Sequence, residues 1–220
     1  MVRAIIFDLD GTLVDSMEAH FLSFRGAILE HAGIEFTRQD FRLLFGKLAR
    51  IIAQEFLESK NLEQDFDYDA IAEKKHEFFR NKHIQEVKLL PGVEKLLQDL
   101  EENNIPMAIA SNSPRQNIEA MLKETKIKKY FKVTMAVDEV SKPKPHPEIY
   151  LTTAEKLGVK PAECVVVEDS THGIKTAKNA KMKSKAVLTG GATQQELEAE
   201  NPTLIVKTLE ELDAQTIIRP

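Results

Sequence analysis

The sequence predicts an α/β protein: a doubly wound, parallel, Rossmann-like sheet interrupted by an inserted helical segment. Two observations predict this fold. Short apolar runs alternate with helical patterns over most of the chain, and this repetition is typical of a doubly wound sheet. The runs are also apolar throughout instead of at every second residue, as expected for strands buried on both faces of a parallel sheet.

The first predicted strand stands at the start of the chain, and the others follow after a long interval. The apolar runs that we assign to strands are Ala4–Phe7, Ala108–Ala110, Val165–Val167, Ala186–Leu188 and Leu204–Val206. Before the second run, Pro91-Gly92 marks the return to the core. A predicted helix follows, with apolar residues at Val93, Leu96, Leu97 and Leu100.

The interval after the first strand is predicted to be a helical insertion. Between Ser16 and Gln85 the apolar residues recur at helical spacing, as at Phe41, Leu44 and Leu48. We therefore assign residues 1–15 and 86–220 to the α/β core and residues 16–85 to a helical cap.

Composition and charge limit the possible partners and the compartment. Lys and Arg total 30 against 35 Asp and Glu, so the net charge is −5, which argues against a nucleic-acid partner. The N-terminus does not resemble a signal peptide, and no apolar run reaches the roughly 18 residues of a membrane span. The single cysteine, Cys164, cannot form an internal disulfide and fits a reducing compartment. We expect a cytoplasmic monomer with no membrane or nucleic-acid partner.

Polar residues follow the predicted strands at the edge where open α/β sheets bind ligands. The segments after the first three runs are Asp8-Leu9-Asp10-Gly11-Thr12, Ser111-Asn112-Ser113 and Glu168-Asp169-Ser170. Asp8 and Asp10 point to one side while the chain stays extended, and Asp169 is expected to join them from a neighbouring strand. Clustered carboxylates repel one another, so a hard cation such as Mg²⁺ would stabilise them. Lys144 could add a fixed positive charge for a phosphoryl group.

Local structure alone could explain each of these segments. Asp10-Gly11 is a common turn pair, and Asp8 could cap a turn. Ser113 could be the N-cap of a helix that starts at Pro114, although capping does not account for Ser111.

These segments, in this order, resemble the haloacid dehalogenase superfamily, in particular its phosphatases and phosphomutases with a helical cap after the first motif. The matching motifs are Asp8-Leu9-Asp10-Gly11-Thr12, Ser111-Asn112, Lys144-Pro145, and Glu168-Asp169-Ser170 followed by Gly173. The resemblance covers nearly the whole chain. It implies a Mg²⁺-dependent phosphatase for a small phosphorylated metabolite, such as a sugar phosphate, with an aspartyl-phosphate intermediate.

The resemblance also implies a role for each matching residue. Asp8 would attack phosphorus, and Asp10 would protonate the leaving oxygen and then activate water. The superfamily's dehalogenases lack the second aspartate of the first motif, so Asp10 favours phosphoryl transfer. The Mg²⁺ ligands would be Asp8, the backbone carbonyl of Asp10, Asp169 and, directly or through water, Glu168. The groups holding the phosphoryl oxygens would be Ser111, the Asn112 amide and Lys144.

The predicted cap also resembles that of β-phosphoglucomutase and sugar-phosphate phosphatases, but its match is looser than that of the four core motifs. His20, Arg50 and Lys75 fall near substrate-binding positions, although Arg50 lies one residue later than the arginine of the mutases. A core position, Lys181, also departs from the pattern, because the family often has glycine there. Two other functions stay open: a phosphosugar mutase of β-phosphoglucomutase type, and a phospho-acceptor signalling module.

Overall fold

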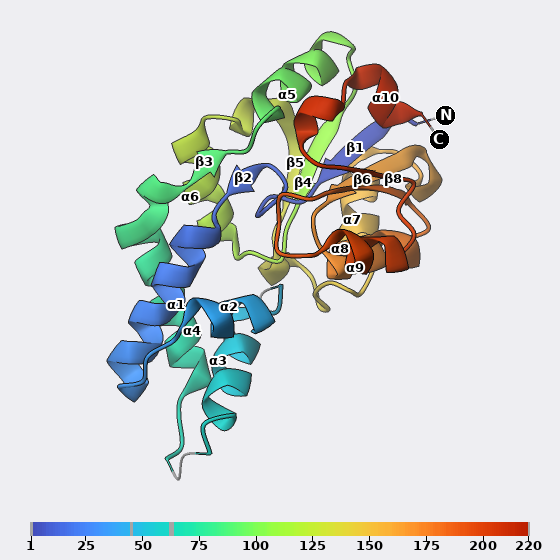
Figure 1. The fold of residues 1–220 in the computed structure, drawn as a ribbon. Helices are drawn as coiled ribbons and strands as arrows, with labels where there is room; N and C mark the ends of the chain where they lie inside the picture. Colours follow the sequence, from blue (N-terminus) through green and yellow to red (C-terminus); the bar gives the residue numbers. More distant parts are fainter. Residues whose placement is uncertain (1, 45, 62–63, 220) are drawn as a thin grey trace. The chain divides into compact units, whose positions relative to one another are not determined.

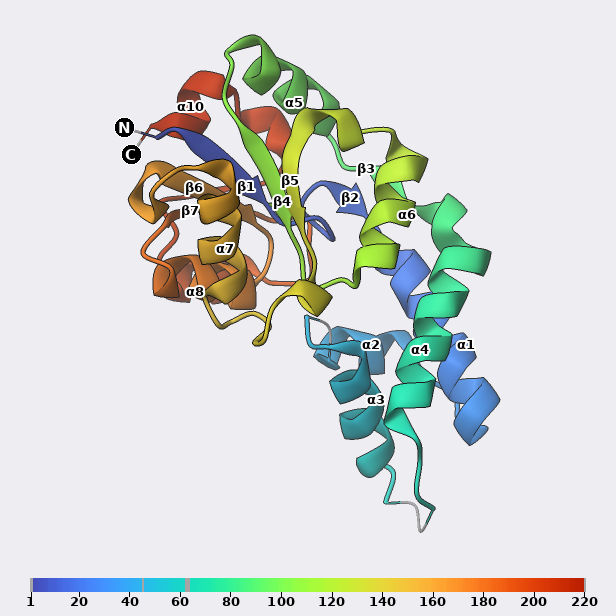
Figure 2. The ribbon, with the colours of Figure 1, turned by 180° about the vertical axis from the view of Figure 1, so that it is seen from behind.

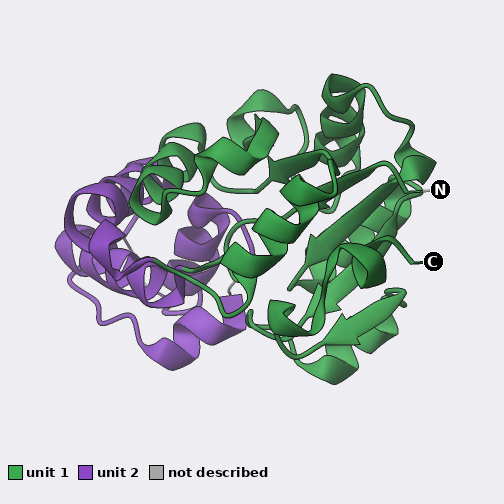
Figure 3. Ribbon diagram, turned by 90° about the horizontal axis from the view of Figure 1, so that it is seen from above, with its two compact units in different colours: residues 1–15, 88–220 green, residues 16–87 purple. Residues whose placement is uncertain are grey.

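The structure is a computed structural model that describes residues 2–44, 46–61 and 64–219 (Figure 1). The chain forms two compact units, coloured separately in Figure 3. Residues 1–15 and 88–220 form the first, here named the core unit, and residues 16–87 form the second, the helical unit. In the described part of the chain, no helix combines the length and apolar character that crossing a bilayer requires.

The core unit is built on a parallel sheet, which confirms the predicted fold class. Within the described residues the sheet has six strands in the order β5-β4-β1-β6-β7-β8, and all neighbouring pairs are parallel. Their bounds are β1 Ala4–Phe7, β4 Met107–Ala110, β5 Phe131–Met135, β6 Cys164–Glu168, β7 Lys183–Val187 and β8 Leu204–Val206. Every residue of β1, β4 and β6 is buried, and all of them except Glu168 at the end of β6 are apolar, as expected for strands covered on both faces.

The sequence analysis missed β5 and misplaced β7. Strand β5 lies at the sheet edge, and of its residues only Met135 is buried, so it lacks an apolar run. Strand β7 begins at Lys183, before the predicted Ala186, because Ser184 and Lys185 are buried despite their polarity. A short antiparallel pair, β2 Val14–Asp15 with β3 Lys88–Leu89, also went unpredicted.

Helices cover the sheet. In the core unit they are α5 Val93–Glu102, α6 Arg115–Thr125, α7 Glu148–Leu157, α8 Thr171–Asn179, α9 Gln194–Ala199 and α10 Ala214–Ile218. Short 3₁₀ turns are η3 Lys128–Tyr130, η4 Val137–Glu139, η5 Pro161–Glu163 and η6 Leu209–Glu211. Apolar side chains of α7 and α8 pack on alternate residues of β1 and β6, and Figure 2 shows these two helices on the near side of the sheet. This burial fixes the strands whose ends carry the polar motifs.

The helical unit has its own core of aromatic side chains. Its elements are α1 Met17–Ala32, α2 Arg38–Leu44, α3 Ala49–Glu58, α4 Tyr68–Phe78, the π-helix η1 Phe79–His83 and the 3₁₀ turn η2 Ile84–Glu86. Phe24, Phe36 and Phe56 are among its buried residues, and the rings of Phe36 and Phe56 meet edge to face with centroids 4.8 Å apart.

Candidate active site

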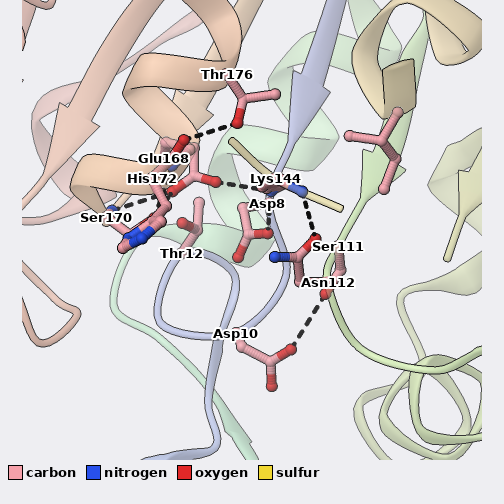
Figure 4. A network of polar contacts seen from close by, with 12 residues as sticks. Asp8, Asp10, Thr12, Ser111, Asn112, Lys144, Glu168, Ser170, His172 and Thr176 are labelled. Carbon is pink, nitrogen blue, oxygen red and sulfur yellow. Dashed lines mark hydrogen bonds and ion pairs between the residues drawn. The ribbon is translucent and has the colours of Figure 1, made fainter. Parts of the chain in front are cut away.

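The polar segments meet at the carboxyl ends of the central strands (Figure 4). Asp8 follows β1, and its backbone N–H donates to Val167 O of β6 at 2.9 Å. Ser111 follows β4, and Glu168 is the last residue of β6. Because β1 lies between β4 and β6, parallel pairing brings side chains from distant parts of the sequence to one place.

Lys144 joins two of the acidic groups. Its Nζ lies 2.6 Å from Asp8 Oδ1 and 2.7 Å from Glu168 Oε1, and its side chain is only 3% exposed. The backbone N–H of Lys144 donates to Asn112 Oδ1 at 3.1 Å, which ties its loop to the end of β4. The cation therefore sits beside Asp8, whose carboxylate it stabilises in the charged form.

Asp8, Glu168 and Asp169 form a buried acidic cluster whose facing oxygens all lie within 4.8 Å of one another. Burial, more than its charged neighbours, raises the pKa of Asp8 to about 8. Burial and the charges of Glu168 and Asp8 raise the pKa of Asp169 well above its usual value. Burial also acts to raise the pKa of Glu168, but the charge and hydrogen bond of Lys144 together with the hydrogen bonds from Ser170 outweigh it, so the net change is downward. Three buried carboxylates beside one lysine are a donor set that suits a hard divalent cation.

Asp169 is enclosed by residues with no room for larger side chains. Thr12 Oγ1 donates to Asp169 Oδ1 at 2.9 Å. Gly11, at φ 79°, and Gly190 both approach the other oxygen so closely that an added Cβ would overlap Asp169 Oδ2. Thr189 Oγ1 donates to Gly11 O at 2.7 Å and ties the two loops together. Sequence reasoning missed Gly190, although the Gly190-Gly191 pair just beyond a predicted strand was an available signal.

Asp10 lies next to two serine hydroxyls. Ser113 Oγ donates to Asp10 Oδ2 at 2.8 Å, and Ser111 Oγ approaches the same oxygen at 3.3 Å. The interpretation of Ser113 as a helix cap is wrong: helix α6 begins at Arg115, and Pro114 is its N-cap residue. The hydroxyl of Ser113 points to Asp10 instead, a contact between segments that local sequence patterns do not reveal.

The candidate substrate residues of the insertion fall into two groups within the helical unit. Lys75 Nζ lies 2.9 Å from His20 Nδ1, both side chains are buried, and the His20 ring stacks on Phe79 with centroids 4.4 Å apart. Arg50 is exposed and pairs with Asp69 Oδ1 at 3.0 Å. The structure thus brings His20 and Lys75 together and gives Arg50 separate partners.

Comparisons with known proteins identify the family and relatives of this chain. The sequence profile described as haloacid dehalogenase-like hydrolase matches residues 5–187. A phosphorylated carbohydrates phosphatase of Thermotoga maritima is 34% identical over 81% of this chain and 82% of its own length. The fructose-1-phosphate phosphatase of Escherichia coli is also 34% identical, over 81% of this chain and 92% of its own length.

A solved structure shares the complete fold. The β-phosphoglucomutase of Clostridium difficile superposes with a TM-score of 0.85 at 29% identity, covering 99% of this chain and 96% of that one. The family match and the phosphatase relatives show that the chain is a phosphoric monoester hydrolase. With its motifs assembled at the strand ends and the profile matched from residue 5 to residue 187, the chain belongs to the haloacid dehalogenase-like hydrolase family.

Proposed function

We propose that this hydrolase is a Mg²⁺-dependent phosphatase that acts on a small phosphorylated sugar through an aspartyl-phosphate intermediate. The observation that carries the proposal is the contact of Asp8 with Lys144 inside a buried acidic cluster. A nucleophilic carboxylate beside a fixed cation suits attack on a phosphoryl group, whose negative charge needs stabilisation. The sugar-phosphate class is supported by the names of the two relatives.

In the first step, a carboxylate oxygen of Asp8 forms a bond to phosphorus while the bond from phosphorus to the ester oxygen breaks. Asp10 donates a proton to that leaving oxygen. In the second step, Asp10 takes a proton from water, the water oxygen attacks phosphorus, and Asp8 is released together with phosphate. Division into two steps lowers each barrier, and the proton transfers supply about 10² to 10⁴-fold in rate.

Ser111, the Asn112 amide and Lys144 bind the phosphoryl oxygens in this scheme. Lys144 is suited to it because its Nζ already lies 2.6 Å from the attacking carboxylate of Asp8. Both the serine and the asparagine directly follow β4, so the sheet holds them in place. Fixed donors stabilise transition-state charge without reorganising during the reaction.

Asp8, Glu168, Asp169 and the backbone carbonyl of Asp10 would hold the Mg²⁺. Its charge, when bound, neutralises the carboxylates and polarises a phosphoryl oxygen. The raised pKa values of Asp8 and Asp169 support a cation at this place. Burial makes ionisation of both carboxyl groups unfavourable, and a bound cation would stabilise their charged forms.

The helical unit would act as the cap that selects the substrate, with His20, Arg50 and Lys75 as the contacting residues. Closure over Asp8 would exclude bulk water and favour small phosphates over phosphoproteins. A second candidate, a phosphosugar mutase, is favoured by the structural similarity to a β-phosphoglucomutase. The same Asp8 chemistry gives isomerisation if the intermediate excludes water and retains its product.

A panel of phosphorylated metabolites, assayed with and without Mg²⁺, tests the proposal. We expect Mg²⁺-dependent phosphate release with a sugar phosphate as the best substrate, and no release by D8N. Full activity of D8N, or of the wild type in excess chelator, would refute the mechanism. Conversion of β-glucose 1-phosphate with a bisphosphate primer to glucose 6-phosphate, faster than phosphate release, would establish the mutase instead.

A further inference from the structure

We propose that Tyr150 is a positioning residue that sets the place of Lys144 through Glu168. The inference rests on the proposed function, in which Lys144 binds the phosphoryl group. Tyr150 lies in α7 and is 0% exposed, so it can reach neither solvent nor substrate. Its hydroxyl donates to Glu168 Oε1 at 3.0 Å.

The two oxygens of Glu168 have different partners. Oε2 accepts from the backbone N–H groups of Asp169 and Ser170, both at 3.0 Å, and from Ser170 Oγ at 2.8 Å. Oε1 accepts from Tyr150 and from Lys144 Nζ, the latter at 2.7 Å. The loop after β6 therefore fixes one oxygen, and the tyrosine shares the other with the lysine.

Tyr150 also contacts Lys144 directly. The Nζ of Lys144 lies 4.8 Å from the centroid of the Tyr150 ring, within the range of cation–π attraction. The same Nζ is 2.6 Å from Asp8 Oδ1. Lys144 is thus held between Asp8, Glu168 and the ring of Tyr150. The tyrosine contacts both Lys144, through its ring, and Glu168, through its hydroxyl.

The hydroxyl decides how strongly Glu168 attracts the lysine. A carboxylate oxygen that accepts a hydrogen bond from the hydroxyl attracts Lys144 less strongly. The ammonium of Lys144 then stays available to Asp8 and to a phosphoryl oxygen. Without the hydroxyl, Oε1 would rely on Lys144 alone and draw it away from Asp8. Phenylalanine would keep the ring and its place in the buried cluster that α7 forms with β1 and β6, so Y150F isolates the hydroxyl.

The test compares Y150F with Y130F, a control at the other buried tyrosine of the core unit, 7% exposed and outside the site. With a generic aryl phosphate and Mg²⁺, we expect Y150F to lower kcat about tenfold, the effect of one hydrogen bond to a charged group. KM should change less than kcat, because phosphoryl charge is most dispersed in the transition state. Y130F should keep the wild-type kcat, and Y150F, which loses one buried hydrogen bond, should unfold a few degrees below the wild type and stay folded at the assay temperature.

A second readout needs no turnover. Inorganic phosphate with Mg²⁺ should raise the unfolding temperature of the wild type and of Y130F more than that of Y150F, because a displaced Lys144 binds phosphate less well. Wild-type kcat in Y150F, or an equal shift in wild type and Y150F, overturns the inference while the hydrolysis by the wild type stands. If the wild type hydrolyses no phosphate ester, the proposed function fails, and the thermal shift alone decides on Tyr150.

Discussion

Replacing Gly190 with alanine tests whether the acidic cluster is a metal site. The Cβ of G190A would overlap Asp169 Oδ2, so the carboxylate must move or rotate away from Asp8 and Glu168. Thr12, which donates to Asp169 Oδ1 at 2.9 Å, opposes that movement. We expect the substitution to weaken metal binding, because the displaced Asp169 can no longer direct its oxygen toward the site that it forms with Asp8 and Glu168.

Disturbing a group that orients a metal ligand typically costs 10 to 100-fold in metal affinity, and we expect about 100-fold weaker Mg²⁺ binding in G190A. Titration calorimetry with MgCl₂ measures this directly. The control is G158A, at a glycine with φ 71° and no neighbouring atom within 4 Å of the added Cβ, so it strains the backbone away from the site. G158A should lower the unfolding temperature and keep the Mg²⁺ affinity. Wild-type Mg²⁺ affinity in a folded G190A protein would refute the assignment of Asp169 as a ligand.

Other perturbations test the remaining groups. Mg²⁺ affinity should rise at least about 50-fold from pH 6 to pH 8, because protons on Asp8, whose pKa burial raises to about 8, and on Asp169, whose pKa is also raised, compete with the metal; calorimetry showing equal affinity at both pH values contradicts this. D10N should slow the first step with alkyl phosphates about 10² to 10⁴-fold and with aryl phosphates less, since aryl leaving groups scarcely need a proton; burst kinetics with equal losses would remove Asp10 from the acid role. R50A should reduce kcat/KM for the preferred sugar phosphate and spare a small aryl phosphate, whereas equal loss for both would place Arg50 outside specificity. K181G should stabilise the protein by about 1 kcal/mol in urea unfolding, because Lys181 has φ 58°, while K178G in helix α8 should destabilise it by a similar amount; a destabilised K181G would refute the strain argument.

Local sequence patterns determined the central strands and the motifs at their ends. Ala4–Phe7 was predicted with its exact bounds because every residue in it is apolar. A continuous apolar run of this length indicates a strand buried on both faces, and all four residues are buried. Asp8 follows immediately, and chain polarity alone places it at the carboxyl end of the sheet. The departure at Lys181 was also visible in the sequence, and the structure gives that residue a left-handed backbone.

Only the tertiary structure determined which side chains from distant segments contact one another. Strand β5 escaped prediction because Lys132 and Thr134 interrupt its apolar residues, and only Met135 of the strand is buried. Ser113 turns to Asp10, Gly190 closes on Asp169, and Tyr150 donates to Glu168, although each pair is separated by many residues of unrelated sequence. Periodicity reports only whether a residue is buried; which side chain it meets depends on the strand order and on the helices packed across the sheet, and these arise only when the whole chain folds.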